Sequence, residues 1–301
     1  MELYKKRDFG ELIGAPFIFF GKEIKTLLTG IVIFIGPFIL SEIVLIRWFG
    51  FHPVEDIYTQ IQNFQYSFGG TSSFMMIFSV FQNVMLYTFI GSYIKVLHKK
   101  GYRNVEINDI WTEIKRFFWP FAGALILGNI IIVIGIIMFV IPGIYIAVAL
   151  YPLFAIIIFE EIGVKNSLPR SFELIKGNWW LSLGLIIIMF IILTTGTAIL
   201  TLFFNFLYRT IAAVGSAYFV LTNITNSFLE VVMSIFLIST SFFLYGYLIS
   251  VKEQPELFNR ISEISEEEDS NVKEMKEIDN EEDESIRFVN EDENDRFKPK
   301  Y

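Results

Sequence analysis

The sequence predicts an all-α protein that crosses a membrane about six times, and composition and the length of its apolar blocks support this prediction. Of the 301 residues, 53% are hydrophobic and 17% are aromatic, and the mean hydropathy is +0.53. Soluble domains are only roughly 45–50% apolar. The apolar residues gather in blocks of about twenty, the length that a helix needs to cross roughly 30 Å of hydrocarbon. A helical membrane protein is therefore the expected class.

Six apolar segments are the expected spans, arranged in hairpins: 27–47, 73–97, 117–139, 143–159, 180–203 and 224–250. The fourth span is short and contains Pro152, and a proline removes one backbone hydrogen bond, so we expect a kink there. Pro37 predicts a second kink, in the first span. The tight turn at Pro142-Gly143 indicates that the third and fourth spans form an antiparallel hairpin.

The distribution of positive charge predicts the orientation of the chain. Fourteen Lys and Arg residues fall on one side of the expected membrane, and only Arg47 and Arg209 fall on the other. Positive residues are retained on the cytoplasmic side, so we expect both termini in the cytoplasm. The non-cytoplasmic connectors are then 49–72, the Pro142-Gly143 turn and 205–223. His52 and His98 lie on opposite sides in this arrangement and cannot share a metal ion.

An acidic tail is expected to follow the helical domain, which we place at residues 1–251. Residues 252–301 contain 18 acidic and 8 basic side chains, whereas residues 1–251 contain 14 acidic and 16 basic side chains. From about Glu256 the tail is rich in Glu, Asp, Asn and Ser, so it is expected to be disordered. A short helical interaction motif around 286–289 is the alternative. The tail is a candidate site for a protein partner, and no nucleic-acid partner is expected.

Three cytoplasmic segments have apolar residues at helical spacing and precede outward-going spans. We expect each to form an amphipathic helix that lies at the level of the lipid headgroups. The apolar faces are Phe9, Leu12, Ile13, Phe20 and Ile24 in the first, Ile107, Ile110, Trp111, Ile114 and Phe118 in the second, and Leu168, Phe172, Ile175 and Trp179 in the third. This suggests a repeated unit of interfacial helix, outward span and return span. The alternative is that any cytoplasmic loop beside a membrane becomes amphipathic.

The expected spans contain only two carboxylates, Glu42 and Glu230. Glu42 is about one turn from Arg47 and is expected to pair with it or to snorkel to the outer interface, with a proton or cation site as the alternative. Glu230 is expected to pair with Arg47 or Arg209 or to lie in a wet cavity. The uncharged polar residues are expected to form hydrogen bonds between helices, with a polar solute pathway as the alternative. The residues considered are Gln82, Asn83, Asn129, Thr194, Thr195 and Thr197. Small residues suit close helix contacts, and examples in the spans are Gly123, Gly128, Gly135, Gly184 and Gly196.

The residue types needed for catalysis are not arranged for it. The chain has no cysteine, no span with two carboxylates, no histidine-rich metal set, no phosphate-binding glycine loop and no serine nucleophile elbow. We therefore expect no enzyme activity, no cofactor and no metal. The scarcity of charge disfavours an ion-coupled transporter. A transporter or channel for an amphipathic or uncharged solute, with a cavity near Asn83, Asn129, Thr195 and Glu230, stays an alternative.

The stretch from Val140 to Trp180 has distinctive elements. They are Ile141-Pro142-Gly143-Ile144-Tyr145, a span that ends in Glu160, then Ser167, Arg170-Ser171-Phe172-Glu173-Leu174 and Lys176-Gly177-Asn178-Trp179-Trp180. This stretch resembles the membrane domain found beside the catalytic domain of some bacterial glycerophosphodiester phosphodiesterases, and related uncharacterised multi-pass membrane proteins. In that family hydrolysis belongs to a separate soluble barrel domain with paired histidines and acidic metal ligands. We do not expect such a domain in this chain, so the resemblance implies an inner-membrane protein and not an esterase.

The residues of this stretch also have structural interpretations. Pro142 and Gly143 are expected to turn the hairpin, Pro169 to lie in the first turn of the third amphipathic helix with Ser167 as its N-cap, and Gly177 to end that helix.

Two alternatives are open for the charged residues of the stretch. Arg170 is expected to pair with Glu173, three residues on, or with Glu160. The other interpretation is a lipid-headgroup site formed by Arg170, Lys176, Asn178, Trp179 and Trp180, in which the tryptophans anchor the next span at the interface. The leading hypothesis is a non-catalytic protein that interacts with the lipid bilayer, in particular anionic phospholipid, and organises the membrane.

Overall fold

The computed structural model describes residues 3–48, 70–101, 105–211, 218 and 221–253, and all regular structure in these residues is helical. By its internal contacts the chain divides into two units, Met1–Ile249 and Ser250–Tyr301. Only residues 250–253 of the second unit are described. The domain boundary at residue 252 and the disorder of the acidic tail therefore stay predictions.

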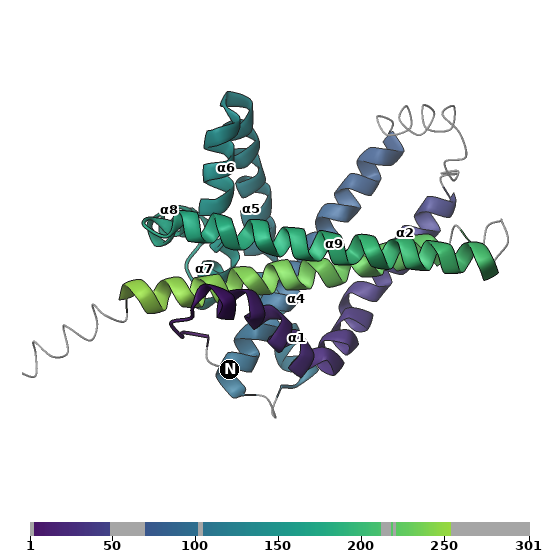
Figure 1. The fold of residues 1–301 in the computed structure, drawn as a ribbon, viewed down its shortest axis with the longest axis horizontal. Helices are drawn as coiled ribbons and strands as arrows, with labels where there is room; N and C mark the ends of the chain where they lie inside the picture. The colour runs from purple at the N-terminus through teal and green to yellow at the C-terminus, as the bar shows by residue number, and fades with distance from the viewer. Residues whose placement is uncertain (1–2, 49–69, 102–104, 212–217, 219–220, 254–301) are drawn as a thin grey trace, which may run out of the picture. The chain divides into compact units, whose positions relative to one another are not determined.

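The helices, in chain order, follow the predicted apolar blocks (Figure 1). They are α1 (Phe9–Gly30), the π-helical turn η1 (Ile31–Ile35), α2 (Gly36–Trp48), α4 (Gly70–Lys100), α5 (Ile107–Met138), α6 (Val140–Ala149), α7 (Leu153–Phe159), α8 (Val164–Ile175) and α9 (Trp179–Ile211), followed by the helix Leu221–Glu253. The predicted all-α class is confirmed. Within the described residues, five helical segments are long and apolar enough to cross a membrane: Phe9–Ser41, Ile107–Met138, Val140–Phe159, Trp179–Thr210 and Leu221–Glu253.

Helix α4 covers the second predicted span but is not one of these five. It is not counted with them because the side chains of residues 70–77, where its apolar block begins, lie outside the described residues; its described part also carries the polar residues Gln82, Asn83, Thr88 and Ser92. Thr88 and Ser92 are tolerated because the second half of α4 is enclosed by protein and contacts η1, α5 and α7. Thr88 and Ser92 are fully buried, and Thr88 donates its hydroxyl to a carbonyl of its own helix.

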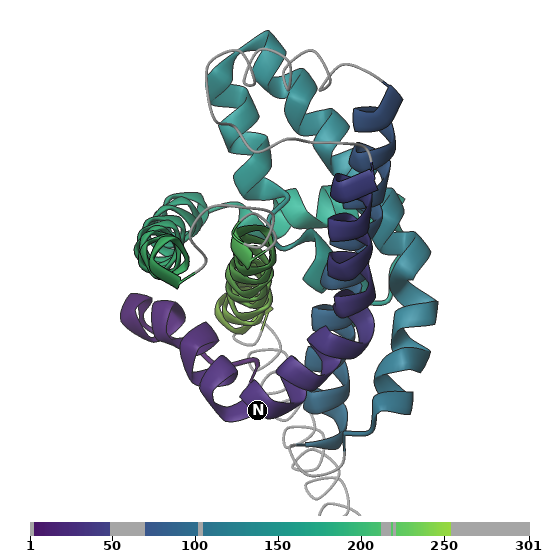
Figure 2. The ribbon, with the colours of Figure 1, turned by 90° about the vertical axis from the view of Figure 1, so that its right-hand side faces the viewer.

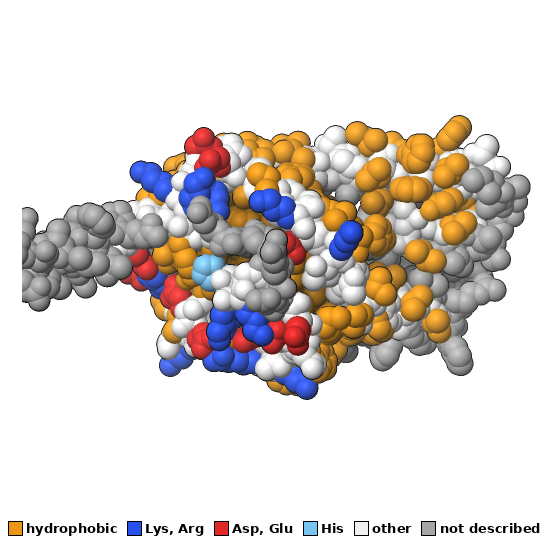
Figure 3. Space-filling view, turned by 90° about the horizontal axis from the view of Figure 1, so that it is seen from below, with side chains coloured by type: hydrophobic (Ala, Val, Ile, Leu, Met, Phe, Trp, Pro, Cys, Tyr) orange, Lys and Arg blue, Asp and Glu red, His pale blue; other side chains and the backbone are white. Residues whose placement is uncertain are grey.

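Much of the apolar surface of the described residues faces outward. Ile137 and Ile141, at the far end of the hairpin of α5 and α6, are 78% and 80% exposed. A soluble protein rarely exposes contiguous apolar patches of this extent, because water makes them unfavourable. On the face drawn in Figure 3, charged side chains gather in one region and hydrophobic side chains cover another. The hydrocarbon core of a bilayer is a favourable environment for such an apolar surface.

The first span bends where the kink was predicted. The N–H of Gly36 donates to the carbonyl of Ile31, an i to i−5 bond that marks the π-helical turn just before Pro37. Proline has no N–H to continue the regular pattern, so the extra residue is accommodated here. The segment from α1 through η1 to α2 changes direction in both ribbon views (Figures 1 and 2).

Helices α5 and α6 form the predicted antiparallel hairpin, and the two lie side by side in Figure 1. The position of the turn is a correction: the chain reverses at Phe139, which is extended, and Pro142 and Gly143 lie in the first turn of α6. Proline is accommodated in a first turn because its missing N–H has no helical partner there. A Cβ on Gly143 would lie 2.8 Å from the backbone N of Ile136. Gly143 therefore lets the two backbones approach closely.

Other glycine and proline predictions have mixed outcomes. Gly135 is confirmed as a close contact, since a Cβ there would lie 3.1 Å from the Cα of Gly143. The prediction of a close helix contact at Gly196 is wrong, because within the described residues a Cβ there would meet nothing within 4 Å. Pro152 interrupts the fourth span as predicted: α6 ends at Ala149, and Pro152 is the N-cap of α7.

Two of the three expected interfacial helices are not separate elements. Helix α1 runs directly into η1 and α2, and α5 runs without a break from Ile107 to Met138. In α1 the buried stripe includes Leu12, Phe19 and Leu27, whereas Phe9 and Ile24 are exposed. The apolar spacing was recognised correctly, but packing against protein uses the same periodicity as packing against lipid. Only α8 is a separate amphipathic helix, so the threefold repeat does not appear as three equivalent units in the described residues.

Candidate functional site

Helix α8 is docked on α5, α6 and α7, with Ser167, Ser171, Leu174 and Ile175 buried. Its N-cap is Gly163, one turn earlier than predicted, so Ser167 is not the cap and Pro169 lies beyond the first turn. The Ser167 hydroxyl donates to the carbonyls of Ile162 and Gly163. This bonding satisfies the hydroxyl locally and allows a serine inside the helix.

Arg170 forms both of the ion pairs that were considered from the sequence. Its Nε lies 3.1 Å from Oε2 of Glu160, and its Nη1 lies 3.7 Å from Oε2 of Glu173. The hydroxyl of Tyr245 donates to Oε1 of Glu160, at 3.3 Å. Glu160 therefore joins α8 to the helix Leu221–Glu253. With two carboxylates beside it, the Arg170 guanidinium serves the protein's own packing.

The segment after α8 places the remaining predicted lipid contacts. Gly177 has φ +89, a left-handed conformation that follows the end of α8 as predicted. Lys176 is exposed, and Asn178 is half-buried and accepts the N–H of Ser182 on its backbone carbonyl. Trp179 stacks on Tyr145 of α6, with ring centroids 5.6 Å apart, and its indole N–H donates to the Tyr145 carbonyl.

The neighbouring tryptophan has a different position. Trp180 is 79% exposed and meets Trp179 edge to face at 4.7 Å. One tryptophan thus fixes the start of α9 to the hairpin, and the other leaves most of its surface exposed. This is the arrangement expected at a membrane interface, where an amphipathic ring lies at headgroup level.

A charged network lies directly before α8, and the sequence reading did not identify it. Glu161 has φ 54, the one positive φ of a non-glycine residue in the described part of the chain. Its carboxylate lies 2.6 Å from Nζ of Lys95 on α4 and 2.6 Å from Nη2 of Arg116 on α5. Lys95 also lies 3.2 Å from Oε2 of Glu113 and 4.4 Å from the ring centroid of Phe117.

These contacts change the acidity of Glu161. The hydrogen bond from Lys95 lowers the pKa of the Glu161 carboxyl most, burial partly offsets this effect, and Arg116 lowers the pKa further. Glu160 and Glu161 are adjacent in the connector before α8, but their carboxylates bind different helices. One reaches α8 and the helix Leu221–Glu253, and the other reaches α4 and α5. The connector before α8 is therefore held by four helices.

A second residue that sequence reading missed is Glu23 of α1. It is buried, and its Oε2 accepts the hydroxyl of Tyr93 from α4. Its place in the stripe of Leu12, Phe19 and Leu27, at three- and four-residue spacing, was the available signal. Glu23 lies just before the block that was assigned to the first span, so it was not counted among the membrane carboxylates.

A cavity of about 880 Å³ lies between α4, α5, the segment of α6 and α7, and the helix Leu221–Glu253. Asn83 and Asn129 both line it, as the transport alternative expected, together with Tyr87, Tyr151 and Ser241. Thr195 and Glu230 do not line this cavity. Glu230 is exposed and forms no ion pair within the described residues. The side chains of Glu42 and Arg47 lie outside the described residues.

Four of the polar residues were expected to form hydrogen bonds between helices, but in the structure they bond to their own helices. The side-chain amides of Asn83 and Asn129 donate to the backbone carbonyls of Ser79 and Leu125, one turn earlier in their own helices. The hydroxyls of Thr194 and Thr197 likewise donate to backbone carbonyls of α9. These short side chains reach the carbonyl one turn back, which satisfies the donor without a second helix. Tyrosine makes the longer bridge, since the hydroxyl of Tyr151 donates to the Leu237 carbonyl at 2.7 Å. No three His, Cys, Asp or Glu side chains of the described residues are grouped to hold a metal ion.

The long apolar helices, the hairpin and the apolar outer surface define a multi-pass helical membrane protein. The family model for the membrane domain of glycerophosphoryl diester phosphodiesterase matches residues 120–282, more than half of the chain. The chain belongs to this family, and the resemblance inferred from residues 140–180 is confirmed. The match is to the membrane domain, and it includes α6 to α9 and the whole candidate lipid site. No curated protein and no solved structure is significantly similar to the chain.

Proposed function

We propose that this chain is a non-catalytic membrane protein that binds anionic phospholipid along the rim formed by α8 and the start of α9, and that it organises lipid or protein there. The observation that supports this function is the exposure of two lysines, Lys165 in the first turn of α8 and Lys176 at its C-terminal end, and of Trp180 at the start of α9. Neither lysine forms an ion pair with a described residue. We call Lys165, Lys176 and Trp180 the α8 rim.

The α8 rim has the chemistry that attracts anionic headgroups. Each lysine near an anionic membrane surface contributes about 1 kcal/mol of attraction, and tryptophan prefers the same interfacial depth. The ion pair between Arg170 and Glu160 holds α8 in place, so the lysines are presented by a docked helix. A fixed arrangement loses less conformational entropy on binding than a flexible basic segment does.

The proposed membrane and orientation follow from charge. Fourteen Lys and Arg residues against two favour an orientation in which the α8 rim and both termini face the cytoplasm, and the family resemblance favours the inner (plasma) membrane. The acidic segment 252–301 would then be available to a cytoplasmic protein partner. The absence of esterase activity is supported by the match to a membrane domain, since hydrolysis belongs to another domain in the resembling proteins.

Lipid enrichment around the protein tests this proposal. The protein is reconstituted in equimolar phosphatidylglycerol and phosphatidylcholine, extracted in polymer nanodiscs, and the ratio of the two lipids is measured. The wild type is expected to be enriched in phosphatidylglycerol, and the double variant Lys165→Gln/Lys176→Gln to lose most of this enrichment.

Arg170→Gln is the matched control for this measurement. It removes a cation from the same helix, but one that two carboxylates already neutralise, so it should lower thermal stability and leave the lipid ratio unchanged. An unchanged lipid ratio in the double lysine variant would refute the role of the α8 rim.

A second function, passage of a small uncharged solute, is favoured by the cavity that Asn83 and Asn129 line. Glycerol and urea permeation into proteoliposomes, followed by light scattering, tests it. This function predicts faster permeation than in empty liposomes and a loss of the increase in Asn83→Leu. Equal rates in wild-type and empty liposomes would exclude it for these solutes.

A further inference from the structure

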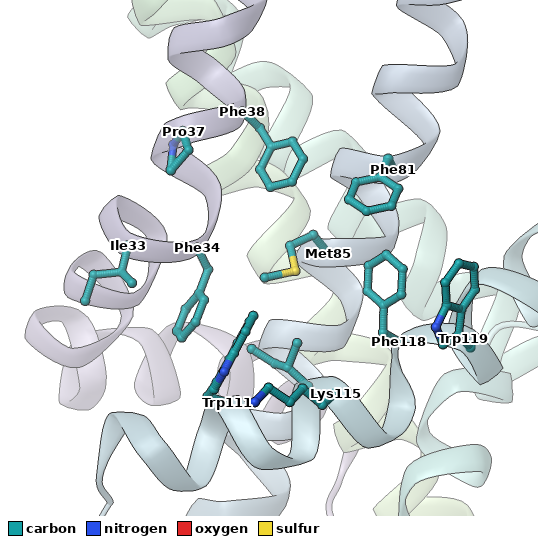
Figure 4. Close-up of a pocket in the computed structure, with 11 residues that line it drawn as sticks. Ile33, Phe34, Pro37, Phe38, Phe81, Met85, Trp111, Lys115, Phe118 and Trp119 are labelled. Carbon is teal, nitrogen blue, oxygen red and sulfur yellow. The ribbon is translucent and has the colours of Figure 1, made fainter.

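An apolar groove of about 660 Å³ lies between η1 and α2 on one side and α4 and α5 on the other. Its walls are mainly aromatic: Phe34, Phe38, Phe81, Trp111, Phe118 and Trp119 (Figure 4). Met85 lies between the walls, and Lys115 lies beside Trp111 at one end. Ligand pockets usually have volumes of about 300–1,000 Å³, so the groove has the size of a ligand site.

The aromatic walls support one another, so the groove is preformed. Phe34 stacks on Trp111 with centroids 5.7 Å apart and an interplanar angle of 16°. Phe81 contacts Phe38 at 5.8 Å and Phe118 at 4.9 Å. Aromatic pairs in these geometries add stability beyond the area they bury. These contacts fix the positions of the two walls relative to each other without a ligand.

The groove opens to the outer surface of the helices that cross the membrane. Ile33, Phe81, Trp111 and Trp119 are all exposed side chains. In a bilayer this opening meets lipid tails, so an acyl chain can enter from the side. The wall contributed by Ile33 and Phe34 belongs to the π-helical turn. Such turns are often found at functional sites, because they displace side chains from the regular helical position.

Lys115 gives the groove a polar end. Its Nζ lies 5.1 Å from the ring centroid of Trp111, and it pairs with no described carboxylate. The nearest acidic residues in the sequence have other cations: Glu113 lies beside Lys95, and Asp109 pairs with Lys100 at 2.7 Å. The groove thus combines a long apolar slot with one unpaired positive charge, which is the complement of an anionic amphiphile.

We propose that this groove holds one acyl chain of an anionic phospholipid, with the phosphate of that lipid bound by Lys115. All the lining residues precede residue 120, so the site lies outside the part of the chain that matches the family. The proposal rests on the proposed function in treating anionic lipid as the ligand. It uses none of the residues of the α8 rim, so the two can fail separately.

Native mass spectrometry of the intact protein tests this site. Protein purified in detergent is titrated with phosphatidylglycerol or phosphatidylcholine, and the dissociation constant of the first bound lipid is measured. We expect the wild type to bind phosphatidylglycerol more tightly. Lys115→Gln should weaken this binding about fivefold, the loss of one lysine–phosphate attraction, and leave phosphatidylcholine binding unchanged.

Two further variants make the test specific. Ile33→Trp fills the mouth of the groove at an exposed position, so it should weaken binding of both lipids without loss of folding. Lys99→Gln removes an exposed lysine away from the groove and should change neither. Equal binding of the two lipids by the wild type, equal effects of Lys115→Gln and Lys99→Gln, or no effect of Ile33→Trp would each overturn the proposal. Loss of lipid binding only in Lys165→Gln/Lys176→Gln would retain the α8 rim and exclude the groove.

Discussion

Lys95→Met is expected to destabilise the protein much more than Lys100→Met, although both lysines lie on α4 and both form ion pairs. The Lys95 side chain is 13% exposed and lies close to Glu161, Glu113 and the Phe117 ring. Methionine keeps an unbranched apolar stem at this position but removes the charge over the Phe117 ring and a partly buried hydrogen bond between charged groups, which is worth about 1.5–3 kcal/mol. Glu161 keeps Arg116, whereas Glu113 loses its cation. We expect a loss of about 2–3 kcal/mol.

Lys100→Met is the matched control, because Lys100 is 43% exposed and pairs with Asp109 at 2.7 Å. Exposed pairs contribute about 0.2–1 kcal/mol. With about 2–4 °C of melting temperature per kcal/mol, Lys95→Met should lower the apparent melting temperature in detergent by about 4–12 °C, and Lys100→Met by at most a few degrees. Similar shifts for the two variants would show that the connector before α8 does not depend on the Lys95 pairs.

Three further predictions concern the hairpin and the ends of α8. Gly143→Ala should lower the free energy of unfolding by about 1–3 kcal/mol, because its Cβ would meet the Ile136 backbone. Gly196→Ala is the control and should not lower it, and both variants are compared with the wild type by melting temperature. Gly177→Ala should destabilise by about 1–2 kcal/mol, because φ +89 is unfavourable for alanine. The cations beside Glu161 lower its pKa in the folded state, so its stabilisation is complete above the ordinary glutamate pKa of about 4.3 and disappears as the pH falls through the lower folded value. The melting-temperature difference between wild type and Glu161→Gln should therefore be constant near neutral pH and shrink under acid conditions; a difference independent of pH would contradict this.

The features that sequence predicted well are those that local sequence determines. Apolar block length located the helices, and Pro37 and Pro152 located the two irregular positions, because a missing N–H acts within one turn. The Arg170 pairs were also accessible, since Glu173 is three residues away on the same helix.

The features that sequence reading missed depend on tertiary packing. Lys95 and Glu161 are 66 residues apart, and Arg116 and Glu161 are 45 apart, so no local pattern joins them. Amphipathic spacing did not distinguish a helix docked on protein from one lying on lipid, because both bury one face. The assignment of bonds between helices failed at Asn83 and Asn129 because a helical side chain can reach its own backbone first.

Side-specific labelling of single cysteines tests the membrane arrangement that underlies the proposed lipid site. The chain has no cysteine, so Gln60→Cys and Lys165→Cys each report one position without further changes. In intact cells, a membrane-impermeant maleimide should label Gln60→Cys, and it should label Lys165→Cys only after the membrane is permeabilised. Labelling of Lys165→Cys from outside intact cells would place the α8 rim on the non-cytoplasmic side and contradict the proposed orientation.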